Sequence, residues 1–393
     1  MKPPSFERVG VAILGSTGSI GRQTLSVIDR HPDRFKVVAL AGGHNTGLLS
    51  RQVSRFGPTL VSSSVQFDSV LPDGVRALNG PEGLVAVATH PDADIVVVAT
   101  GGHDALSPTI QAISAGKTIA LANKEVIVCA GALIMSLAAK AGVKIRPVDS
   151  EHSAIWQCMS AASAGQIQRL ILTASGGPFL TTPESELGKM TAHEALAHPT
   201  WSMGAKVTID SATMMNKGLE LIEAHWLFDV PFSRIDVLIH PESIIHSLIE
   251  LTDGAQIAQL ASPDMRQPIQ FALTYPERLD SGVPTLSLSD IGCLRFALPD
   301  FILFPALGIA RQAGEAGGTM PTVLSAVDDV AVAAFLAGRI TFGDIPAVLG
   351  AILGRHDNQP VDTIEIVQQT DIWARREAEL LIEKKSGTTF SLT

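Results

Sequence analysis

The sequence has 393 residues, of which 46% are hydrophobic and only 5% are aromatic, and its formal net charge is −10. This composition excludes a disordered chain, a coiled coil and a collagen-like chain, and it favours an aliphatic core beneath buried parallel strands. The acidic balance and the lack of a long basic run argue against nucleic acid as a partner, because such binders neutralise phosphates with clustered cations.

The first 149 residues alternate short aliphatic runs with helical stretches. Strands are predicted at Val9–Leu14, Lys36–Ala41, Ile95–Ala99, Thr118–Ala122 and Val143–Val148, with helices at Ile20–Arg30, Thr109–Ala115 and Val126–Ala141. Alternation of strand and helix at this spacing indicates βαβ units. We therefore expect an N-terminal domain at residues 1–149 with a Rossmann-like parallel sheet.

A different pattern follows over residues 150–280. Strands are predicted at Arg169–Ala174, Ile235–His240, Ser243–Leu251 and Ile257–Ala261, and helices at Ser211–Phe228 and Met265–Thr274. This pattern predicts a central α/β domain with a mixed sheet. A stretch rich in Ser, Pro, Gly and Asp then predicts a linker at residues 281–300.

Residues 301–393 read as helical. Thr322–Ala337 is apolar at helical spacing and stops at Gly338, Asp344 is placed to cap Ile345–Arg355, and Thr363–Lys385 is amphipathic. These helices predict a small C-terminal bundle. The overall expectation is an α/β protein with two sheets and a helical C-terminal domain.

Three cysteines, Cys129, Cys158 and Cys293, form neither a disulfide framework nor a zinc pattern, which favours a reducing compartment. The longest uncharged apolar run, Val126–Ala139, is too short to span a bilayer, and the N-terminus carries no signal-peptide core. We therefore expect a cytoplasmic protein with no membrane partner.

A glycine-rich turn at Gly15–Gly21 follows the first predicted strand and opens a helix. Glycines let the backbone approach a pyrophosphate, and a helix N-terminus offers free N–H groups. The spacing is GxxGxxG, and a purely structural tight turn is the alternative. NAD-binding units place a carboxylate after the second strand, but here Ala41–Asn45 has none, which favours NADP. His44 is open to two readings, a phosphate contact or a solvated loop residue.

Carboxylates with ligand spacing lie near the domain boundary. Asp149 and Glu151 are two residues apart, so in an extended chain they point the same way. Asn216, Lys217, Glu220 and Glu223 share one face of the predicted helix, which faces a cleft or solvent. Together such oxygens would select Mg²⁺ or Mn²⁺, although solvated surface carboxylates are the alternative.

A second polar cluster has the chemistry of a phosphate site. Ser175 follows a strand, His198 precedes a proline, and Ser211 starts the predicted helix that carries Asn216 and Lys217. Hydroxyls, an amide and an ammonium suit a phosphate monoester, with ordinary turn chemistry as the alternative reading of Ser175 and His198.

These motifs together resemble a known family. In order, they are Gly15–Gly21, Ala122–Glu125, Asp149–His152, Ser175–Phe179, His198–Gly204, Asp210–Glu220, His240–Ser243 and Pro263–Pro268. The chain resembles, over nearly its whole length, the 1-deoxy-D-xylulose 5-phosphate reductoisomerase family of the non-mevalonate isoprenoid pathway. The Asp210–Glu220 block is long enough to be highly specific.

The resemblance implies a homodimer that uses NADPH and a divalent cation (Mg²⁺, Mn²⁺ or Co²⁺) on a small phosphorylated sugar. It also implies that residues 1–149 bind NADP and that residues 150–280 bind metal and substrate. The implied cofactor contacts are Thr17, Gly18, Ser19, Ile20, Gly43, His44, Asn45, Asn123, Glu125 and Gly204. The implied metal ligands are Asp149, Glu151 and Glu220, which with Lys124 are also the implied catalytic residues. The implied substrate contacts are Lys124, Ser150, Glu151, Ser175, His198, Ser211, Asn216, Lys217 and Glu220.

The implied reaction rearranges the substrate to an aldehyde and reduces it to 2-C-methyl-D-erythritol 4-phosphate. A retro-aldol/aldol pair and a direct shift both remain open as the route of the rearrangement. The alternative functions are an NADP-dependent dehydrogenase without isomerisation and a nucleotide-sensing regulator.

The sequence departs from the pattern of the family at two places. Many relatives carry a basic residue where His44 stands, and Ser325–Asp329 replaces a pattern with asparagines and a glutamate. Trp201, between Pro199 and Gly204, is interpreted as part of a substrate lid, or else it packs on its own domain.

Overall fold

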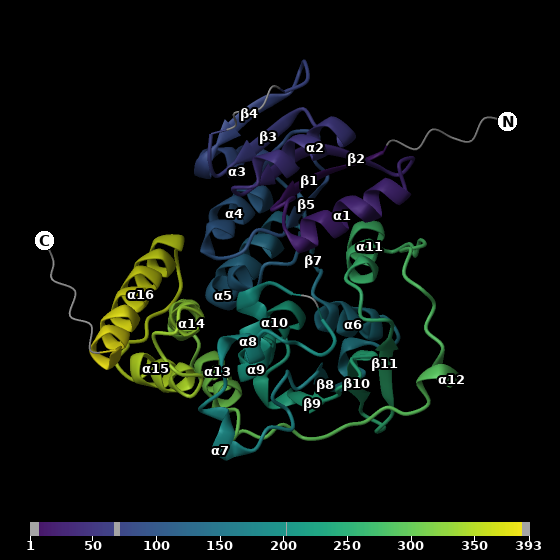
Figure 1. Ribbon diagram of the computed structural model, residues 1–393. Coiled ribbons are helices and arrows are strands. Elements are labelled where there is room, and N and C mark those ends of the chain that lie inside the picture. The colour runs from purple at the N-terminus through teal and green to yellow at the C-terminus, as the bar shows by residue number, and fades with distance from the viewer. Residues whose placement is uncertain (1–7, 67–70, 202, 387–393) are drawn as a thin grey trace, which may run out of the picture. The chain divides into compact units, whose positions relative to one another are not determined.

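The computed structural model describes residues 8–66, 71–201 and 203–386, and the chain divides into two compact units (Figure 1). The first unit comprises Met1–Val126, Ile134–Ser153 and Asp264–Thr285, and the second comprises Ile127–Leu133, Ala154–Pro263 and Leu286–Thr393. None of the described helices combines the length and apolar character that a membrane span requires.

A parallel sheet of seven strands forms the centre of the first unit, in the order β4-β3-β2-β1-β5-β6-β7. The strands are β1 Val9–Leu14, β2 Phe35–Gly42, β3 Leu60–Ser63, β4 Arg76–Asn79, β5 Ile95–Val98, β6 Thr118–Leu121 and β7 Ile145–Pro147. The predicted parallel sheet is therefore confirmed. The sequence pattern missed β3 and β4, which have four residues each, and β4 is mostly exposed at the sheet edge.

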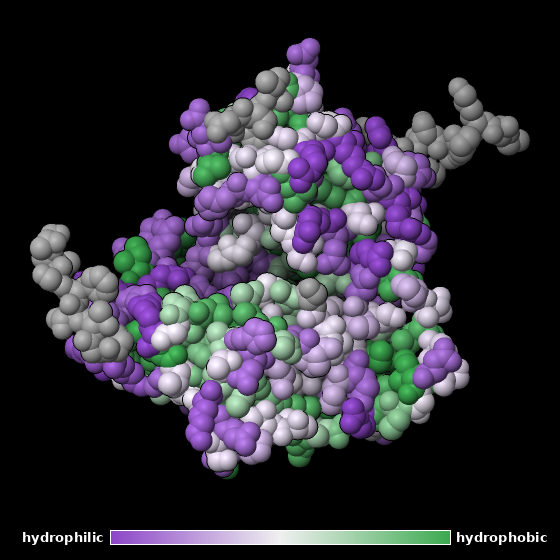
Figure 2. Space-filling model, in the orientation of Figure 1, coloured by the Kyte–Doolittle hydropathy of each residue, from purple (hydrophilic) through white to green (hydrophobic). Residues whose placement is uncertain are grey.

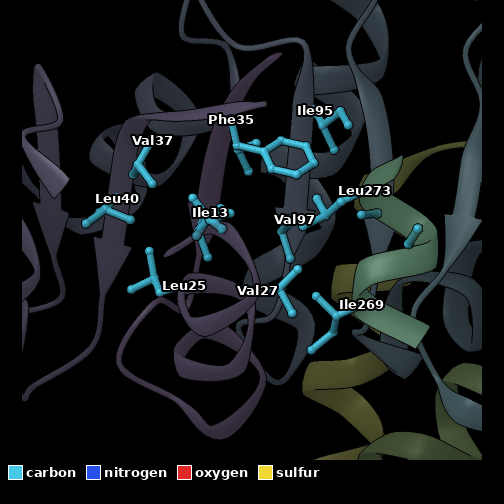
Figure 3. Close-up of a cluster of buried hydrophobic side chains, with 14 of the residues drawn as sticks. Ile13, Leu25, Val27, Phe35, Val37, Leu40, Ile95, Val97, Ile269 and Leu273 are labelled. Carbon is cyan, nitrogen blue, oxygen red and sulfur yellow. The ribbon is translucent and has the colours of Figure 1, made fainter. Parts of the chain in front are cut away.

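The helices of the first unit pack on this sheet. They are α1 Ser19–Arg30, α2 Thr46–Phe56, α3 Gly80–Ala88, α4 Leu106–Ser114 and α11 Arg266–Thr274, with parts of α5 Lys124–Ala141 and α6 Ser150–Met159. Helix α1 packs beside α11, and α3 packs beside α4 (Figure 1). Figure 3 shows Ile269 and Leu273 of α11 in the same aliphatic cluster as Ile13, Val27 and Val97. A helix from late in the chain thus completes the core of the first unit.

The second unit contains a mixed sheet of four strands in the order β11-β10-β8-β9, as predicted. Its strands are β8 Ile167–Ala174, β9 Ile235–Ile239, β10 Ile245–Leu251 and β11 Gln256–Leu260. Strand β10 runs antiparallel to β8 and β11, whereas β9 is parallel to β8. The helices that follow β8 are α7 Glu184–Leu187, α8 Ala192–Ala195, α9 Ala205–Thr213 and α10 Met215–Phe228.

The single helix predicted at Ser211–Phe228 is wrong, because α9 and α10 are separate. The break falls at Met214, whose φ is +64°. Thr213 Oγ1 accepts a hydrogen bond from the Met215 N–H at 3.3 Å and donates to the Asp210 carbonyl at 3.2 Å, so a side chain satisfies backbone groups at the break. Ser211 consequently lies near the end of α9 and does not start a helix.

The C-terminal part of the second unit is helical, which confirms the predicted bundle. Its helices are α12 Leu288–Ile291, α13 Pro305–Ala316, α14 Met320–Leu336, α15 Asp344–Leu353 and α16 Ile364–Ser386. Helix α14 packs against α13, α15 and α16, and most of its side chains are buried. Asp344 was expected to cap α15, but it is the first helical residue, and its carboxylate accepts hydrogen bonds from the N–H and hydroxyl of Thr341.

Candidate active site

The glycine-rich loop lies between β1 and α1 in the first unit. Gly15 has a φ of +85°, and a Cβ on Gly21 would lie 2.3 Å from the Gly15 carbonyl oxygen, so both positions require glycine. The first turn of α1 carries no acidic residue. Thr17, Gly18, Ser19 and Ile20 therefore surround a helix N-terminus that favours an anion.

Gln52 fixes this loop and was not found from the sequence. Its Nε2 donates to the Ser16 carbonyl at 2.8 Å, and its Oε1 accepts from Ser16 Oγ at 2.8 Å. The only sequence signal is a polar residue on the buried face of α2, and that signal does not identify its partner.

The other cofactor residues predicted in the first unit lie along the same sheet edge. Gly43, His44 and Asn45 follow β2, and Asn123 follows β6, so all lie at carboxyl ends of parallel strands, where ligands bind in open α/β sheets. Asn45 Oδ1 caps α2 by accepting from the Leu48 N–H at 3.0 Å. No carboxylate occurs among residues 43–45.

Asn123 already uses its side chain within the protein. Its Nδ2 donates to the carbonyls of Thr100 and Gly102 at 2.9 and 3.0 Å, and its Oδ1 caps α5 by accepting from the Val126 N–H at 2.8 Å. Asn123 therefore organises the loop after β5. Glu125 follows in the first turn of α5.

Lys124 and the first carboxylates come together in the first unit. Lys124 Nζ donates to Asp149 Oδ2, and both side chains are mostly buried. Ser150 Oγ donates to Glu151 Oε2 at 2.5 Å. The expectation of an extended chain at Asp149–Glu151 is wrong, since α6 begins at Ser150 and places Glu151 in its first turn, where the helix dipole favours a negative charge.

Ser175, His198 and Ser211 come together in the second unit. A hydrogen bond of 3.0 Å joins Ser175 Oγ to His198 Nε2. The φ of Gly177 is +70°, and a Cβ there would lie 2.5 Å from the Ser211 carbonyl oxygen. The turn after β8 therefore packs directly on the end of α9, which brings the backbone of Ser211 beside the turn that begins at Ser175.

The protonation state of His198 follows from its contacts. Nδ1 accepts hydrogen bonds from the N–H groups of Thr200 and Trp201 at 3.1 and 2.9 Å, so the ring proton is assigned to Nε2, which donates to Ser175. Burial lowers the pKa of His198 below its usual range. Its neutral form thus presents a donor toward Ser175.

In the His198–Gly204 motif, Ser202 lies outside the described residues, and the centre of the Trp201 ring lies 6.1 Å from that of His246.

Helix α10 carries the remaining charged candidates on a buried face, so the expectation of a solvent-facing stripe is wrong for Lys217, Glu220 and Glu223, while the expectation of a cleft-facing stripe stays a prediction. Glu220 is 1% exposed, and its carboxylate accepts from Asn216 Nδ2 at 2.5 Å and from Lys217 Nζ. Lys217 and Glu223 are also buried. Gly204, predicted to contact cofactor, is the N-cap of α9 in this unit.

The donor sets fit the groups implied by the sequence. Asp149 and Glu151 in the first unit and Glu220 in the second offer carboxylate oxygens, the ligands that hard divalent cations prefer. Hydroxyls, a histidine N–H, an amide and an ammonium in the second unit suit a phosphate. The glycine-rich loop suits a dinucleotide pyrophosphate.

Comparisons with known proteins agree with one another. Three family models match: 1-deoxy-D-xylulose 5-phosphate reductoisomerase at residues 11–131, its C-terminal domain at residues 145–228, and the DXP reductoisomerase C-terminal domain at residues 260–377. The chain is 53% identical over 378 residues to the 1-deoxy-D-xylulose 5-phosphate reductoisomerase of Thermomicrobium roseum, and the match covers 95% of this chain and 98% of that one.

Two solved structures are similar throughout. The reductoisomerase from Zymomonas mobilis in complex with NADPH has a TM-score of 0.89 and 38% identity, and the match covers 96% of this chain and 100% of that one. A crystal structure of DOX-P reductoisomerase in complex with NADPH, fosmidomycin and magnesium has a TM-score of 0.90 and 40% identity, and the match covers 95% and 98% of the two chains.

Proposed function

Because the chain belongs to the 1-deoxy-D-xylulose 5-phosphate reductoisomerase family, we propose roles for its residues in that family's reaction. The protein is an NADP-dependent, divalent-metal-dependent oxidoreductase that converts 1-deoxy-D-xylulose 5-phosphate to 2-C-methyl-D-erythritol 4-phosphate in isoprenoid precursor synthesis. The observation that carries this function is the match to an enzyme of that name over 95% of the chain.

The proposed cofactor site is the carboxyl edge of the parallel sheet. NADPH, when bound, supplies the hydride for the reduction. The N–H groups of Thr17–Ile20 would hold its pyrophosphate, and Gly43–Asn45 would lie beside the ribose phosphate. Asn123 keeps the loop after β5 in place, and Glu125 and Gly204 complete the proposed set.

The proposed ligands of the divalent cation are Asp149, Glu151 and Glu220. When bound, the cation acts as a Lewis acid on the carbonyl and hydroxyl oxygens of the substrate. Lys124 Nζ donates to Asp149 and Lys217 Nζ donates to Glu220, so each of these two proposed ligands has a lysine as its neighbour. Mg²⁺, Mn²⁺ and Co²⁺ all suit an oxygen site, and we propose that any of the three supports turnover.

The proposed substrate residues divide by chemistry. Lys124, which is paired with Asp149, would stabilise the alkoxide that develops as the carbon skeleton rearranges. Ser150 and Glu151 would contact the sugar oxygens.

The phosphate end of the substrate is assigned to the second unit. Ser175, Ser211, Asn216 and Lys217 would bind it, and His198 would donate through Nε2–H. Lys217 is buried and the other four are partly buried, so part of this proposed anion site is shielded from water, where a charge-assisted hydrogen bond is stronger than in bulk water.

A turnover assay tests the function directly. NADPH oxidation should require both 1-deoxy-D-xylulose 5-phosphate and a divalent cation, and it should stop in a chelator. A dehydrogenase without isomerisation, the rival candidate, would keep its activity in the chelator, and a nucleotide-sensing regulator would bind NADPH without oxidising it.

We also propose that the protein is a homodimer in the cytoplasm. Exposed large apolar side chains gather on the segment before α13, where Leu288, Phe296, Leu298, Phe301 and Ile302 are 45–85% exposed. Figure 2 shows a further hydrophobic area over β11. An apolar surface of this kind is typical of an interface, so light scattering should give twice the chain mass. The three free thiols suit a reducing compartment.

A further inference from the structure

A partly buried group of ion pairs joins α9 to the C-terminal helices inside the second unit. Lys206, in the first turn of α9, donates through Nζ to Asp210 Oδ2 at 2.6 Å, one helical turn later, and also to Asp328 of α14. Asp329, the next residue of α14, lies 3.7 Å from the same Nζ. Arg375 of α16 donates to Asp329 at 2.7 Å. Two cations therefore link α9, α14 and α16.

Two of these carboxyl groups are fully enclosed. The side chains of Asp328 and Asp210 are 0% and 2% exposed, and Asp328 Oδ1 and Asp210 Oδ1 have no hydrogen-bond partner among the described residues. Two neighbouring buried carboxylates that share one lysine repel each other, and one proton held between them removes that repulsion. Burial, and next the neighbouring Asp328, raise the pKa of Asp210 well above its usual range, although Lys206 opposes the shift.

We infer that Lys206, Asp210 and Asp328 form a positioning device for the substrate-binding residues, in which the two carboxyl groups share one proton and Lys206 ties α9 to α14. Ser211 follows Asp210 directly, so a displacement of the start of α9 would be transmitted to Ser211 and to the Gly177 turn packed on it. The inference rests on the proposed function, since it assigns Ser211 to the substrate.

The charged groups around Asp210 and Asp328 come from the helices that pack on α9. Lys206 of α9 and Asp329 of α14 are its charged neighbours, and Arg375 binds both Asp329 and Asp371. The ionisable groups on the other helices that contact α9 are His193 and Glu194 of α8, Lys217, Glu220, Glu223 and His225 of α10, and Arg311 and Glu315 of α13.

The shared proton gives the device a pH dependence with a definite sign. The native state holds a proton that the unfolded chain releases at the ordinary pKa of Asp, so stability falls as pH rises toward the raised pKa of Asp210. One such proton changes the unfolding equilibrium constant by up to tenfold per pH unit. Once the proton is lost, α9 is held less firmly, and the KM for the substrate should rise.

The decisive variant is Asp328→Asn. Its amide is isosteric and donates to Asp210 without a shared proton, so the variant should fold. Between about pH 5 and 8 the unfolding equilibrium constant of the variant should rise less steeply with pH than that of wild type. The difference between the two slopes should be up to tenfold per pH unit. Glu379→Gln, which removes one charge from an exposed pair with Arg339, is the matched control and should keep the wild-type slope. A wild-type slope in Asp328→Asn would overturn the inference.

A second measurement separates positioning from general stability. Lys206→Met should raise the KM for 1-deoxy-D-xylulose 5-phosphate at least tenfold with kcat changed less than about threefold, and Lys206→Arg should recover most of that loss. An unchanged KM in a folded Lys206→Met protein would refute the positioning role, and if that variant does not fold, the slope of Asp328→Asn still decides. A wild-type protein that turns over no substrate would instead refute the proposed function, leaving the pH slope as an independent test of proton sharing.

Discussion

Replacing Gly177 with alanine should push the turn after β8 away from the end of α9. The new Cβ would lie 2.5 Å from the Ser211 carbonyl oxygen, about 0.9 Å closer than an ordinary contact allows. The φ of +70° adds a left-handed conformation that costs an alanine about 1–2 kcal/mol. Overpacking of this kind typically costs about 1–3 kcal/mol more. We expect the free energy of unfolding to fall by about 2–5 kcal/mol.

The same displacement should reduce activity, because a shift of about 1 Å at a binding residue costs up to about 100-fold in rate. Urea unfolding and kcat/KM for 1-deoxy-D-xylulose 5-phosphate measure the two effects. Gly254→Ala is the control, because Gly254 has a φ of +85° but no atom within 4 Å of the added Cβ. Equal losses of stability in the two variants, or unchanged kcat/KM in Gly177→Ala, would refute the close approach of the turn to Ser211.

Four further predictions concern the site. Asp149→Asn or Glu220→Gln should weaken Mg²⁺ binding and lower turnover at least tenfold, as ligand losses commonly do, whereas Glu379→Gln should change neither. NADPH should exceed NADH in kcat/KM by about 10- to 150-fold, the worth of one charge-assisted phosphate contact, since no carboxylate follows β2. Binding of 1-deoxy-D-xylulose 5-phosphate should change the tryptophan fluorescence of wild type but not of Trp201→Phe. Burial lowers the pKa of His198, so below about pH 6.5 the imidazole binds a proton more readily in the unfolded chain than in the folded protein. The free energy of unfolding should therefore fall as the pH drops below about 6.5 in wild type, and it should fall less in His198→Asn.

Each of these predictions has a result that would contradict it. Normal Mg²⁺ affinity in both carboxylate variants would remove them from the metal site. Equal efficiency with NADH would show that the residues after β2 do not select the phosphate. A fluorescence change that persists in Trp201→Phe would assign the signal to Trp156, Trp226 or Trp373. An identical loss of stability below about pH 6.5 in wild type and His198→Asn would show that His198 does not titrate in this range.

The strand pattern could be predicted from the sequence because the central strands are buried and aliphatic. Ile95–Val98 is apolar at every position, and the segment that follows it, Thr109–Ala115, has helical spacing. Strand β4 could not be predicted in the same way, because its residues are mostly exposed and carry no alternation. The break at Met214 was also hidden, since a methionine with positive φ leaves no sequence signal and the Thr213 hydrogen bonds that satisfy the break depend on the fold.

The assignment of Asp149, Glu151 and Glu220 as oxygen ligands stays a prediction, because it depends on residue type and on the family resemblance. The local geometry around these residues can be compared with the structure. The conformation around Glu151 was predicted wrongly, because Asp149 and Ser150 are also typical residues at a helix start and α6 forms there. The contact between Gln52 and Ser16 joins positions 36 residues apart, and no local pattern encodes it.

Helix α11 sets the order in which the protein can fold during synthesis. Its Ile269 and Leu273 fill the core beneath a sheet whose last strand, β7, ends at Pro147 (Figure 3). At about 5–20 residues per second, a ribosome needs roughly 6–25 s to make the intervening chain. During that interval the nascent sheet lacks part of its cover, so it is a natural client for chaperones. A fragment that stops after β7 should therefore aggregate. Addition of a separate peptide with residues 264–285, which contains α11, should restore its solubility.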